Sequence, residues 1–248
     1  MTSSTSWSPA VGLSVGSTTL AAVTADHAVT VRPMVVRAGH PVGGFVDRVG
    51  DPVGIVAADG SLHPAAALLA DALRDLARSA NAGRGATVAV AYPGHWRPAE
   101  VEALRRALRR IPHWQAPTLL PDYEAALRAL RVDLPERGVV AVCDFGGTAT
   151  TVTLVDLGTA RLIGTPRQNT DFSGDAIDRA LLNHVLASAG VAPGSTGTSA
   201  IAPLTRLRGE CRAAKERLSA QTATTVPGRT AGLRSDVRIT RPELEELL

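Results

Sequence analysis

The chain has 248 residues, 45% of them hydrophobic, so it can bury one large core or two modest ones. Its formal net charge is only +3 and it has no dense Lys/Arg block, which argues against a nucleic-acid groove. Two cysteines without a CxxC pair exclude a disulfide framework, and the lack of a signal peptide or a long apolar run completes the expectation of a cytoplasmic protein without membrane contact.

Short strands and amphipathic helices alternate in the first half of the chain. A polar, flexible leader is expected at residues 1–9. Strand patterns are expected at 11–15, 20–24, 29–36 and, inside a Gly/Pro/Asp-rich loop at 39–60, at 53–56. The next predicted elements are helices at 64–79, 98–110 and 122–131 and strands at 86–91 and 118–120.

The same order of elements then begins again. Strands are predicted at 139–144, 150–156 and 161–168, and a helix at 175–189. In both halves a Gly/Thr turn separates the first two strands, which indicates an internal duplication. We therefore expect an α/β fold of two related lobes with a cleft between them, lobe I at 10–137 and lobe II at 138–248.

The C-terminal part is expected to be a smaller subdomain at about 175–248. It comprises a low-complexity connector at 190–202, a helix at 204–220 and strands at 222–226 and 237–239. The last residues, TRPELEELL, form a capping box in which Thr240 is the N-cap and Glu243 stands three residues later. The sequence stops soon after this helix begins, so lobe II is expected to be incomplete.

Two turns carry the chemistry that the sequence suggests. Gly16-Ser17-Thr18 and Gly146-Gly147-Thr148 each follow a strand. Glycine and small hydroxyl residues let successive backbone N–H groups point at a phosphate with no Cβ in the way. Either turn alone is more typical of an ordinary Gly-rich hairpin. Two such turns at equivalent places in a repeated unit indicate that both halves face one ligand.

The two turns also resemble a known family. The residues VGLSVGST, from Val11 to Thr18, are similar to the first phosphate loop, IGIDLGTT, of the actin-like ATPase superfamily, and DFGGTA, from Asp144 to Ala149, is similar to its second loop, DLGGGT. Among its members the chain most resembles the nucleotide-binding domain of the heat-shock-70 chaperones, over nearly all of residues 10–248. The resemblance implies an actin-like, ribonuclease H-like fold with ATP or ADP and Mg²⁺ as ligands.

Five further segments keep the family's order. The residues VGD at 49–51 are similar to its VGDAAK segment, VAVAYPGHW at 88–96 to its VTVPAYF strand and turn, and LPDYEAALRAL at 120–130 to its EPTAAAL helix start. SGDAIDRALLNH at 173–184 resembles its GGEDFDNRLVNH helix, and CRAAKERLSAQT at 211–222 resembles its adenosine-binding helix, CERAKRTLSSST. This order favours the fold more strongly than it favours any activity.

The family's catalytic residues carry over only in part. Family members hold Mg²⁺ through water with carboxylates, a role that Asp144 fits and that Ser14, at the matching place in the first turn, does not. The family's catalytic lysine falls at Gly54, and Arg48 is a poor substitute because guanidinium and ammonium groups are not interchangeable. With a one-residue slip, Asp122 is the candidate for the family's glutamate, and helix N-capping is its alternative role.

The expected adenosine contacts are altered as well. Lys215 and Ser219 match the family and, four residues apart, are expected on one face of a helix; Gly174 completes the expected nucleotide site. The family's acid falls at Arg212 and its arginine at Glu216, so two charges are exchanged. The exchange preserves a local ion pair with altered contacts, marks a site that no longer binds, or belongs to an ordinary solvated face.

Two aromatic turns and one cysteine have alternative interpretations. His95 and Trp96, and likewise His113 and Trp114, either form a binding surface with aromatic anchors or pack their loops onto the domain. Cys143 is expected to be a small hydrophobic residue of a buried strand.

Three functions follow from the resemblance. Losing one charge-stabilising group typically costs about 10²–10³-fold in phosphoryl-transfer rate, so the missing lysine and carboxylate predict nucleotide binding with weak or absent hydrolysis. Such a domain would have a regulatory or scaffold role toward a protein partner or client. An active ATP-hydrolysing chaperone domain and a small-molecule kinase of the same superfamily are the alternatives. The lysine-poor, arginine-rich composition is typical of a GC-rich genome, such as an actinobacterial one.

Overall fold

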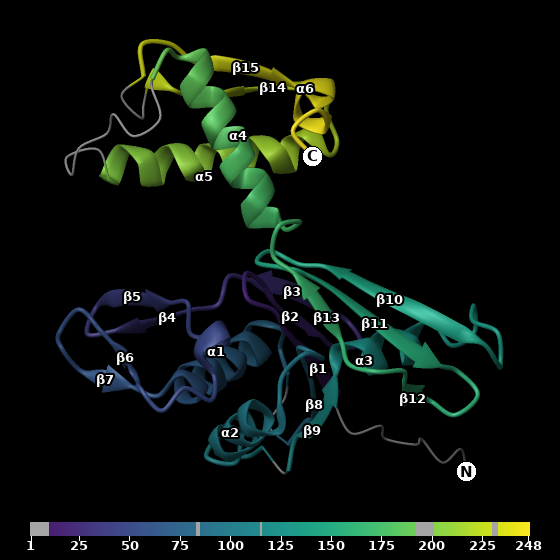
Figure 1. Cartoon of the computed structure of the whole chain (residues 1–248). Coiled ribbons are helices and arrows are strands. Elements are labelled where there is room, and N and C mark those ends of the chain that lie inside the picture. Colours follow the sequence, from purple (N-terminus) through teal and green to yellow (C-terminus); the bar gives the residue numbers. More distant parts are fainter. Residues whose placement is uncertain (1–9, 83–84, 115, 192–200, 230–232) are drawn as a thin grey trace, which may run out of the picture. The chain divides into compact units, whose positions relative to one another are not determined.

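The computed structural model describes residues 10–82, 85–114, 116–191, 201–229 and 233–248. The chain divides into two compact units (Figure 1). The first unit ends at Gln168 and the second begins at Asn169. The expected leader at 1–9 and most of the expected connector at 190–202 lie outside the described residues. The expected lobe boundary at 137/138 stays a prediction.

The first unit contains a five-stranded mixed sheet. Its strands are β1 (Ala10–Val15), β2 (Leu20–Val23), β3 (Ala28–Val31), β8 (Thr87–Tyr92) and β9 (Thr118–Pro121), in the order β3-β2-β1-β8-β9. Neighbours among β1, β2 and β3 are antiparallel, whereas β1–β8 and β8–β9 are parallel. The parallel pairs place the C-terminal ends of β1, β8 and β9 at one edge of the sheet, where the turns that follow them can form a site.

Three helices accompany this sheet. They are α1 (Ala65–Ser79), α2 (Pro98–Leu108) and α3 (Asp122–Ala129), with a 3₁₀ turn, η1, at Val46–Arg48. Helix α1 contacts β1, β2, β3 and α2 and buries Leu68, Leu69 and Leu73 completely (Figure 1). The predicted amphipathic pattern of α1 is therefore confirmed, and it forms the centre of the first core.

Two strands predicted as continuous are each divided by a proline. The segment 29–36 is not one strand: β3 ends at Val31, and β4 (Met34–Arg37) pairs with β5 (His40–Gly43) after Pro33. The segment 161–168 forms only β12 (Arg161–Leu162) and β13 (Arg167–Asn169), with Pro166 between them. Proline lacks the N–H that a continuous ladder needs. A second small hairpin, β6 (Ile55–Val56) with β7 (Leu62–His63), includes part of the predicted strand at 53–56.

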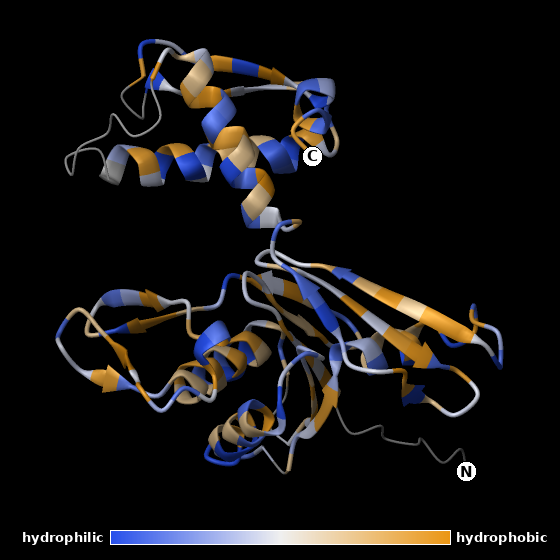
Figure 2. Cartoon of the chain, in the orientation of Figure 1, coloured by the Kyte–Doolittle hydropathy of each residue, from blue (hydrophilic) through white to orange (hydrophobic). Residues whose placement is uncertain are grey.

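A second sheet in the first unit has one exposed apolar face. Strand β10 (Val139–Phe145) pairs with β11 (Thr150–Asp156), which also pairs with β12 and β13. Side chains that alternate along the two strands are exposed, and the hydrophobic colour runs along both strands (Figure 2). Exposed members of this face are Val139, Cys143, Val152 and Leu154. The expectation of a buried Cys143 is therefore wrong, because only one face of this sheet is covered.

The second unit has its own small core. Helices α4 (Gly174–Ser188), α5 (Ile201–Leu218) and α6 (Arg241–Glu245) pack with a hairpin of β14 (Ala223–Val226) and β15 (Val237–Thr240). The capping box is confirmed, since Thr240 and Glu243 each accept the other's backbone N–H. Burial raises the pKa of the Cys211 thiol to about 12, so Cys211 is a core residue of this unit. Among the described helices, none is both long and apolar enough to cross a bilayer.

Candidate functional site

The two predicted turns have the same backbone geometry. In the first, Val15 pairs with Leu20 and the Gly16 N–H donates to the Thr19 carbonyl at 3.0 Å. In the second, Phe145 pairs with Thr150, and the Gly146 N–H donates to the Ala149 carbonyl at 3.0 Å. Ser14 and Asp144 occupy matching positions in the two registers, opposite Ala21 and Thr151. The two hairpins are thus built alike and differ in side-chain charge.

The turns lie against each other. A Cβ added to Gly147 would lie 2.3 Å from both Thr18 Oγ1 and Thr18 Cγ2, closer than any real side-chain contact. Gly16 and Gly146 are also restricted, since a Cβ there would lie 2.9 Å and 2.7 Å from the carbonyl oxygens of Thr19 and Ala149. Glycine is therefore required at Gly16 and Gly146 by the close approach of a backbone carbonyl, and at Gly147 by the close approach of the Thr18 side chain. The structure brings the six predicted turn residues to one place.

Both turns expose backbone donors toward a shared cavity of about 480 Å³. Within the described part of the chain, the N–H groups of Ser17, Thr18, Gly147 and Thr148 donate to no protein acceptor. Unpaired N–H groups that converge from two turns favour an anionic ligand. The cavity also has hydroxyl groups on its wall, because Thr151 and Thr153 of β11 line it and are buried.

Two carboxylates lie at this cavity. Asp144 and Asp122 both line it, and the negative charge of Asp144 raises the pKa of Asp122. Burial raises the pKa of Asp122 most, whereas hydrogen bonds from the Gly94 N–H at 3.0 Å and the Tyr123 N–H at 2.6 Å lower it. The alternative of N-capping does not describe Asp122, because the N-cap of α3 is Pro121. The two acids therefore place carboxyl groups on the wall of this cavity.

The turn before α2 is fixed to the start of α3. A Cβ on Gly94 would lie 2.7 Å from Asp122 Oδ1 and 2.7 Å from Tyr123 Cδ1, so only glycine allows this approach. His95 also lines the cavity. Burial lowers the pKa of its imidazole, and this effect outweighs the negative charges of Asp122, Asp47 and Asp144, which raise it. The imidazole is consequently neutral at neutral pH and can accept or donate one hydrogen bond.

The neighbouring Trp96 has a packing role. Its ring stacks on Tyr92 with centroids 6.3 Å apart and planes 16° apart, and both residues pack on the first core. Of the two interpretations of the YPGHW turn, the structure therefore supports packing for Trp96 and a place at the cavity for His95.

One carboxylate near the first turn escapes sequence reasoning. The Ser17 hydroxyl donates to Oδ1 of Asp47, which lies in η1, thirty residues further along the chain. The negative charge of Asp47 also acts to raise the pKa of His95, against the larger effect of burial. A single aspartate in a Gly/Pro-rich loop gives no local sequence signal of this contact. The first turn therefore has an acid beside it, although not at position 14.

Gly54, where the resemblance would place the family's catalytic lysine, has no room for a side chain. A Cβ on Gly54 would lie 2.7 Å from Leu62 Cγ and 3.0 Å from the His63 carbonyl oxygen. Arg48, the expected poor substitute for this lysine, pairs with Asp51 at 2.9 Å and donates to the Val53 carbonyl at 3.2 Å. Neither Arg48 nor Gly54 lines the cavity.

The remaining predicted nucleotide contacts lie in the second unit. Lys215, on α5, forms an ion pair with Asp178 of α4 at 2.6 Å and donates to the Gly174 carbonyl at 2.9 Å. Asp178 is buried, so the Lys215 ammonium compensates a carboxylate inside the second core. Ser219 follows the end of α5 at Leu218, so it does not continue the helical face of Lys215. This α4–α5 ion pair was not predicted.

The exchanged charges on α5 do form a local ion pair. Arg212 Nε lies 3.2 Å from Glu216 Oε1, four residues along the helix. Glu216 is largely exposed, and such exposed pairs stabilise a helix by only about 0.3–0.5 kcal/mol. This observation agrees both with altered nucleotide contacts and with an ordinary solvated face.

Comparison with known proteins identifies one family. The family model for Hsp70 proteins matches residues 59–248, a range that begins after the first turn and includes the second turn, Asp122 and α5. A search of curated proteins finds no match. Hsp70 domains have the actin-like ATPase fold and bind ATP or ADP with Mg²⁺, and the mixed α/β sheet described above agrees with that fold. Because the match covers more than half of its length, the chain belongs to the Hsp70 protein family.

Proposed function

We propose that this chain binds ATP or ADP with Mg²⁺ between its two turns and hydrolyses ATP slowly or not at all. The observation that supports this most directly is the contact of Gly147 with Thr18, which makes one anion cradle from two separate hairpins. Four unpaired N–H groups around it suit the phosphates of a nucleotide.

The residues present fit both ligands. Phosphate oxygens would accept from the N–H groups of Ser17, Thr18, Gly147 and Thr148, with no Cβ in the way. Asp144 would hold Mg²⁺ through water, and a bound Mg²⁺ would neutralise charge on the β- and γ-phosphates. Metal held through water agrees with the described residues, among which no group of three acids, histidines or cysteines is arranged to ligate a metal directly.

Slow hydrolysis follows from what surrounds this cradle. Position 14 has no charge, and Leu62 and His63 occupy the space that a lysine at position 54 would need. Each lost group typically costs about 10²–10³-fold in rate, although such losses do not add simply. Binding depends mainly on backbone donors and is therefore retained. A domain that binds but does not turn over would act as a regulatory or scaffold module toward a protein partner.

The matched hairpins also support an origin of the fold by duplication. Ser14 and Asp144 hold the same register position, and the two turns close with the same hydrogen bond. We infer lobes at 10–137 and 138–248 from this correspondence, with nucleotide bound where the two turns meet.

Calorimetry tests the proposal. ADP and ATP are titrated into the chain with and without Mg²⁺, and hydrolysis is followed at saturating ATP. We expect Mg²⁺-dependent binding that Asp144→Asn weakens at least about tenfold, or ~1.4 kcal/mol, with little or no turnover. Asp26→Asn removes one charge at the exposed β2–β3 turn and is the matched control. Absence of binding refutes the proposal, and turnover that Asp144→Asn abolishes identifies an active ATPase instead.

A further inference from the structure

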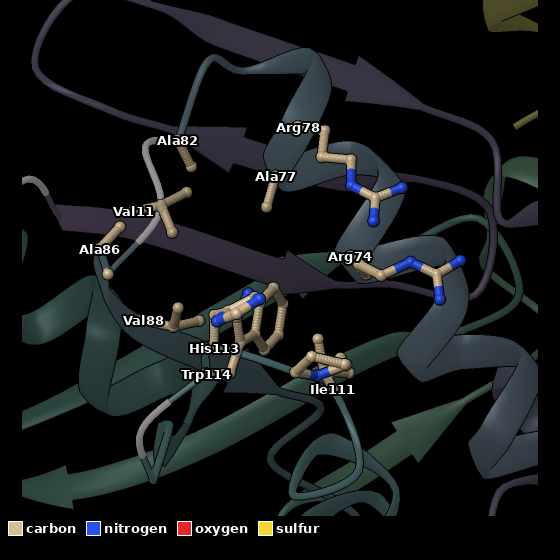
Figure 3. A pocket seen from close by; sticks show the side chains of 12 residues that line it. Val11, Arg74, Ala77, Arg78, Ala82, Ala86, Val88, Ile111, His113 and Trp114 are labelled. Carbon is tan, nitrogen blue, oxygen red and sulfur yellow. The ribbon is translucent and has the colours of Figure 1, made fainter.

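A second cavity, of about 560 Å³, opens at the other end of the first sheet (Figure 3). It lies between the C-terminal half of α1, the starts of β1 and β8, and the turn 111–114. Its inner wall is apolar and buried, with Val11, Ala77, Val88 and Ile111. A volume of this size can hold a large side chain or a small ligand.

This cavity is separate from the nucleotide cradle. Val11 lines it at the start of β1, whereas Ser14 and Val15, at the end of the same strand, line the cavity between the turns. At about 3.3 Å per residue, Val11 and Ser14 lie roughly 10 Å apart. A ligand in the second cavity would therefore leave the phosphate turns free.

The turn that follows α2 carries an aromatic side chain to the cavity. Ile111 is buried and its N–H donates to the Leu108 carbonyl at 3.0 Å, and the Trp114 N–H donates to the Ile111 carbonyl at 3.3 Å. Between them, His113 has a φ of 71°, a left-handed conformation that is costly for a residue with a side chain. In Figure 3, the rings of His113 and Trp114 lie beside Val88 and Ile111. Trp114 thus packs on the core and forms a wall of the cavity.

Arginines lie on one side of this apolar cavity and in the chain segment that leads into its wall. Arg74 and Arg78 project from α1 along one side of it and are paired with Asp71 and Asp75 of the same helix (Figure 3). The chain segment that enters the turn adds three exposed arginines, for which no acidic partner is present among the described residues: Arg106, Arg109 and Arg110. Cations at a helix C-terminus complement its dipole. Because Arg109 and Arg110 directly precede Ile111, which lines the cavity, their exposed charges also add a positive field on this side of it.

We propose that this cavity docks an acidic peptide segment of a partner protein. One large apolar or aromatic side chain of the segment would enter the hollow beside Trp114, and its flanking carboxylates would pair with Arg106, Arg109 and Arg110. A nucleic acid would satisfy the arginines but would leave the recessed aliphatic wall of Val11 and Val88 without a matching group. Charge complementarity and a buried anchor together therefore favour a peptide.

Fluorescence anisotropy with designed peptides tests this docking. The probe is a labelled peptide of Asp and Glu residues around one central Phe. Its companions replace the Phe with Ser, or all acids with Asn and Gln. A labelled single-stranded RNA of similar length is measured in parallel. We expect the first peptide to bind at least about tenfold more tightly than either companion and than the RNA. Saturating ADP should leave peptide affinity unchanged.

Two variants locate the site on the protein. Ala86→Leu fills the cavity from the segment before β8, and Arg106→Glu/Arg109→Glu/Arg110→Glu reverses charge at exposed positions that no core contact depends on. Each of these two variants should weaken binding of the first peptide by at least about tenfold. The matched control, Arg32→Glu/Arg131→Glu/Arg161→Glu, reverses the charge of three exposed arginines elsewhere in the first unit. It should change the affinity for the peptide little. The proposal is overturned if peptide affinity does not depend on the Phe or is unchanged by Ala86→Leu. It is also overturned if the RNA binds more tightly than the first peptide. Circular dichroism verifies that each variant is folded.

Discussion

The hairpins β1–β2 and β10–β11 share one backbone and differ in their surroundings. Both turns close with a glycine N–H bonded to a carbonyl three residues on, at 3.0 Å in each case. Yet Leu13 of β1 is buried under α1, whereas Leu154 of β11 lies on an exposed sheet face. At the ligand side, Ser14 faces Ala21 in one hairpin and Asp144 faces Thr151 in the other.

When both hairpins carry acids, both supply phosphate binding and metal binding. The difference at positions 14 and 144 separates these two properties. Backbone donors depend on the turn, which glycine and close approach maintain in both copies. In the proposed function, metal binding depends on a carboxylate, which Asp144 supplies in the second hairpin and Ser14 does not supply in the first. A site can therefore keep its affinity for phosphate while it loses the charge stabilisation that hydrolysis requires.

The largest difference between the hairpins should be in stability. Leu13 is 2% exposed and Leu154 is 41% exposed. Leu13→Ala removes core packing and should cost about 2–5 kcal/mol in the free energy of unfolding. Leu154→Ala should cost less than about 1 kcal/mol. Denaturant unfolding of both variants measures this directly, and equal losses would mean that the β10–β11 face is covered in solution.

The contact between the turns should be the next most sensitive feature. Gly147→Ala adds a Cβ that would lie 2.3 Å from Thr18, so the turns must separate. We expect a loss of about 1–3 kcal/mol in stability and weaker ADP binding. Gly12→Ala, where the nearest atom to an added Cβ is 3.9 Å away, is the control in the first hairpin. Unchanged ADP affinity in Gly147→Ala would break the claim that the turns form one cradle.

Restoring the acid makes the first hairpin resemble the second. Ser14→Asp places a carboxylate opposite Ala21, near Asp144 and Asp122. We expect weaker ADP binding without Mg²⁺, because like charges accumulate, and tighter binding with Mg²⁺, by up to about tenfold, or ~1.4 kcal/mol. Ser14→Asn has a similar shape without the charge. If both variants respond equally to Mg²⁺, position 14 has no part in metal handling.

The smallest effect should be a change in the pH dependence of stability. Burial raises the pKa of Asp122 above its usual value of 3.8, so folding favours the protonated form. The stabilisation from this proton is complete below the unfolded-state pKa and is lost as pH rises through the folded-state pKa. Asp122→Asn cannot ionise and can still accept from Gly94 and Tyr123. We expect a modestly higher Tm than the parent at about pH 7 and no difference at about pH 3. A parent that is more stable than the variant at neutral pH would contradict this.

Local patterns predicted the elements that carry these hairpins. The spacing of leucines in α1, the strands at 139–144 and 150–156, and the Thr240 capping box all rest on interactions within a few residues. The hairpin β4–β5 was missed because Ala38 and Gly39, both at positive φ, make its turn. Such turns usually carry Asn-Gly or Asp-Gly.

The candidate site was predicted where the chain itself repeats and missed where distant segments meet. The two turns are visible as copies in the sequence. Asp47 contacts Ser17 across thirty residues, and Asp178 pairs with Lys215 from another helix. Such pairings depend on tertiary packing, which one sequence without local periodicity at these positions does not reveal.

The packing around Gly54 bears on how this protein could change over time. An added Cβ would meet Leu62 Cγ at 2.7 Å and the His63 carbonyl at 3.0 Å, so a lysine at position 54 requires the β6–β7 hairpin to move. If position 54 is where the family has its lysine, as we propose, a single substitution there would not place a lysine in a working position. A gain of ATP hydrolysis would then require changes in two segments together.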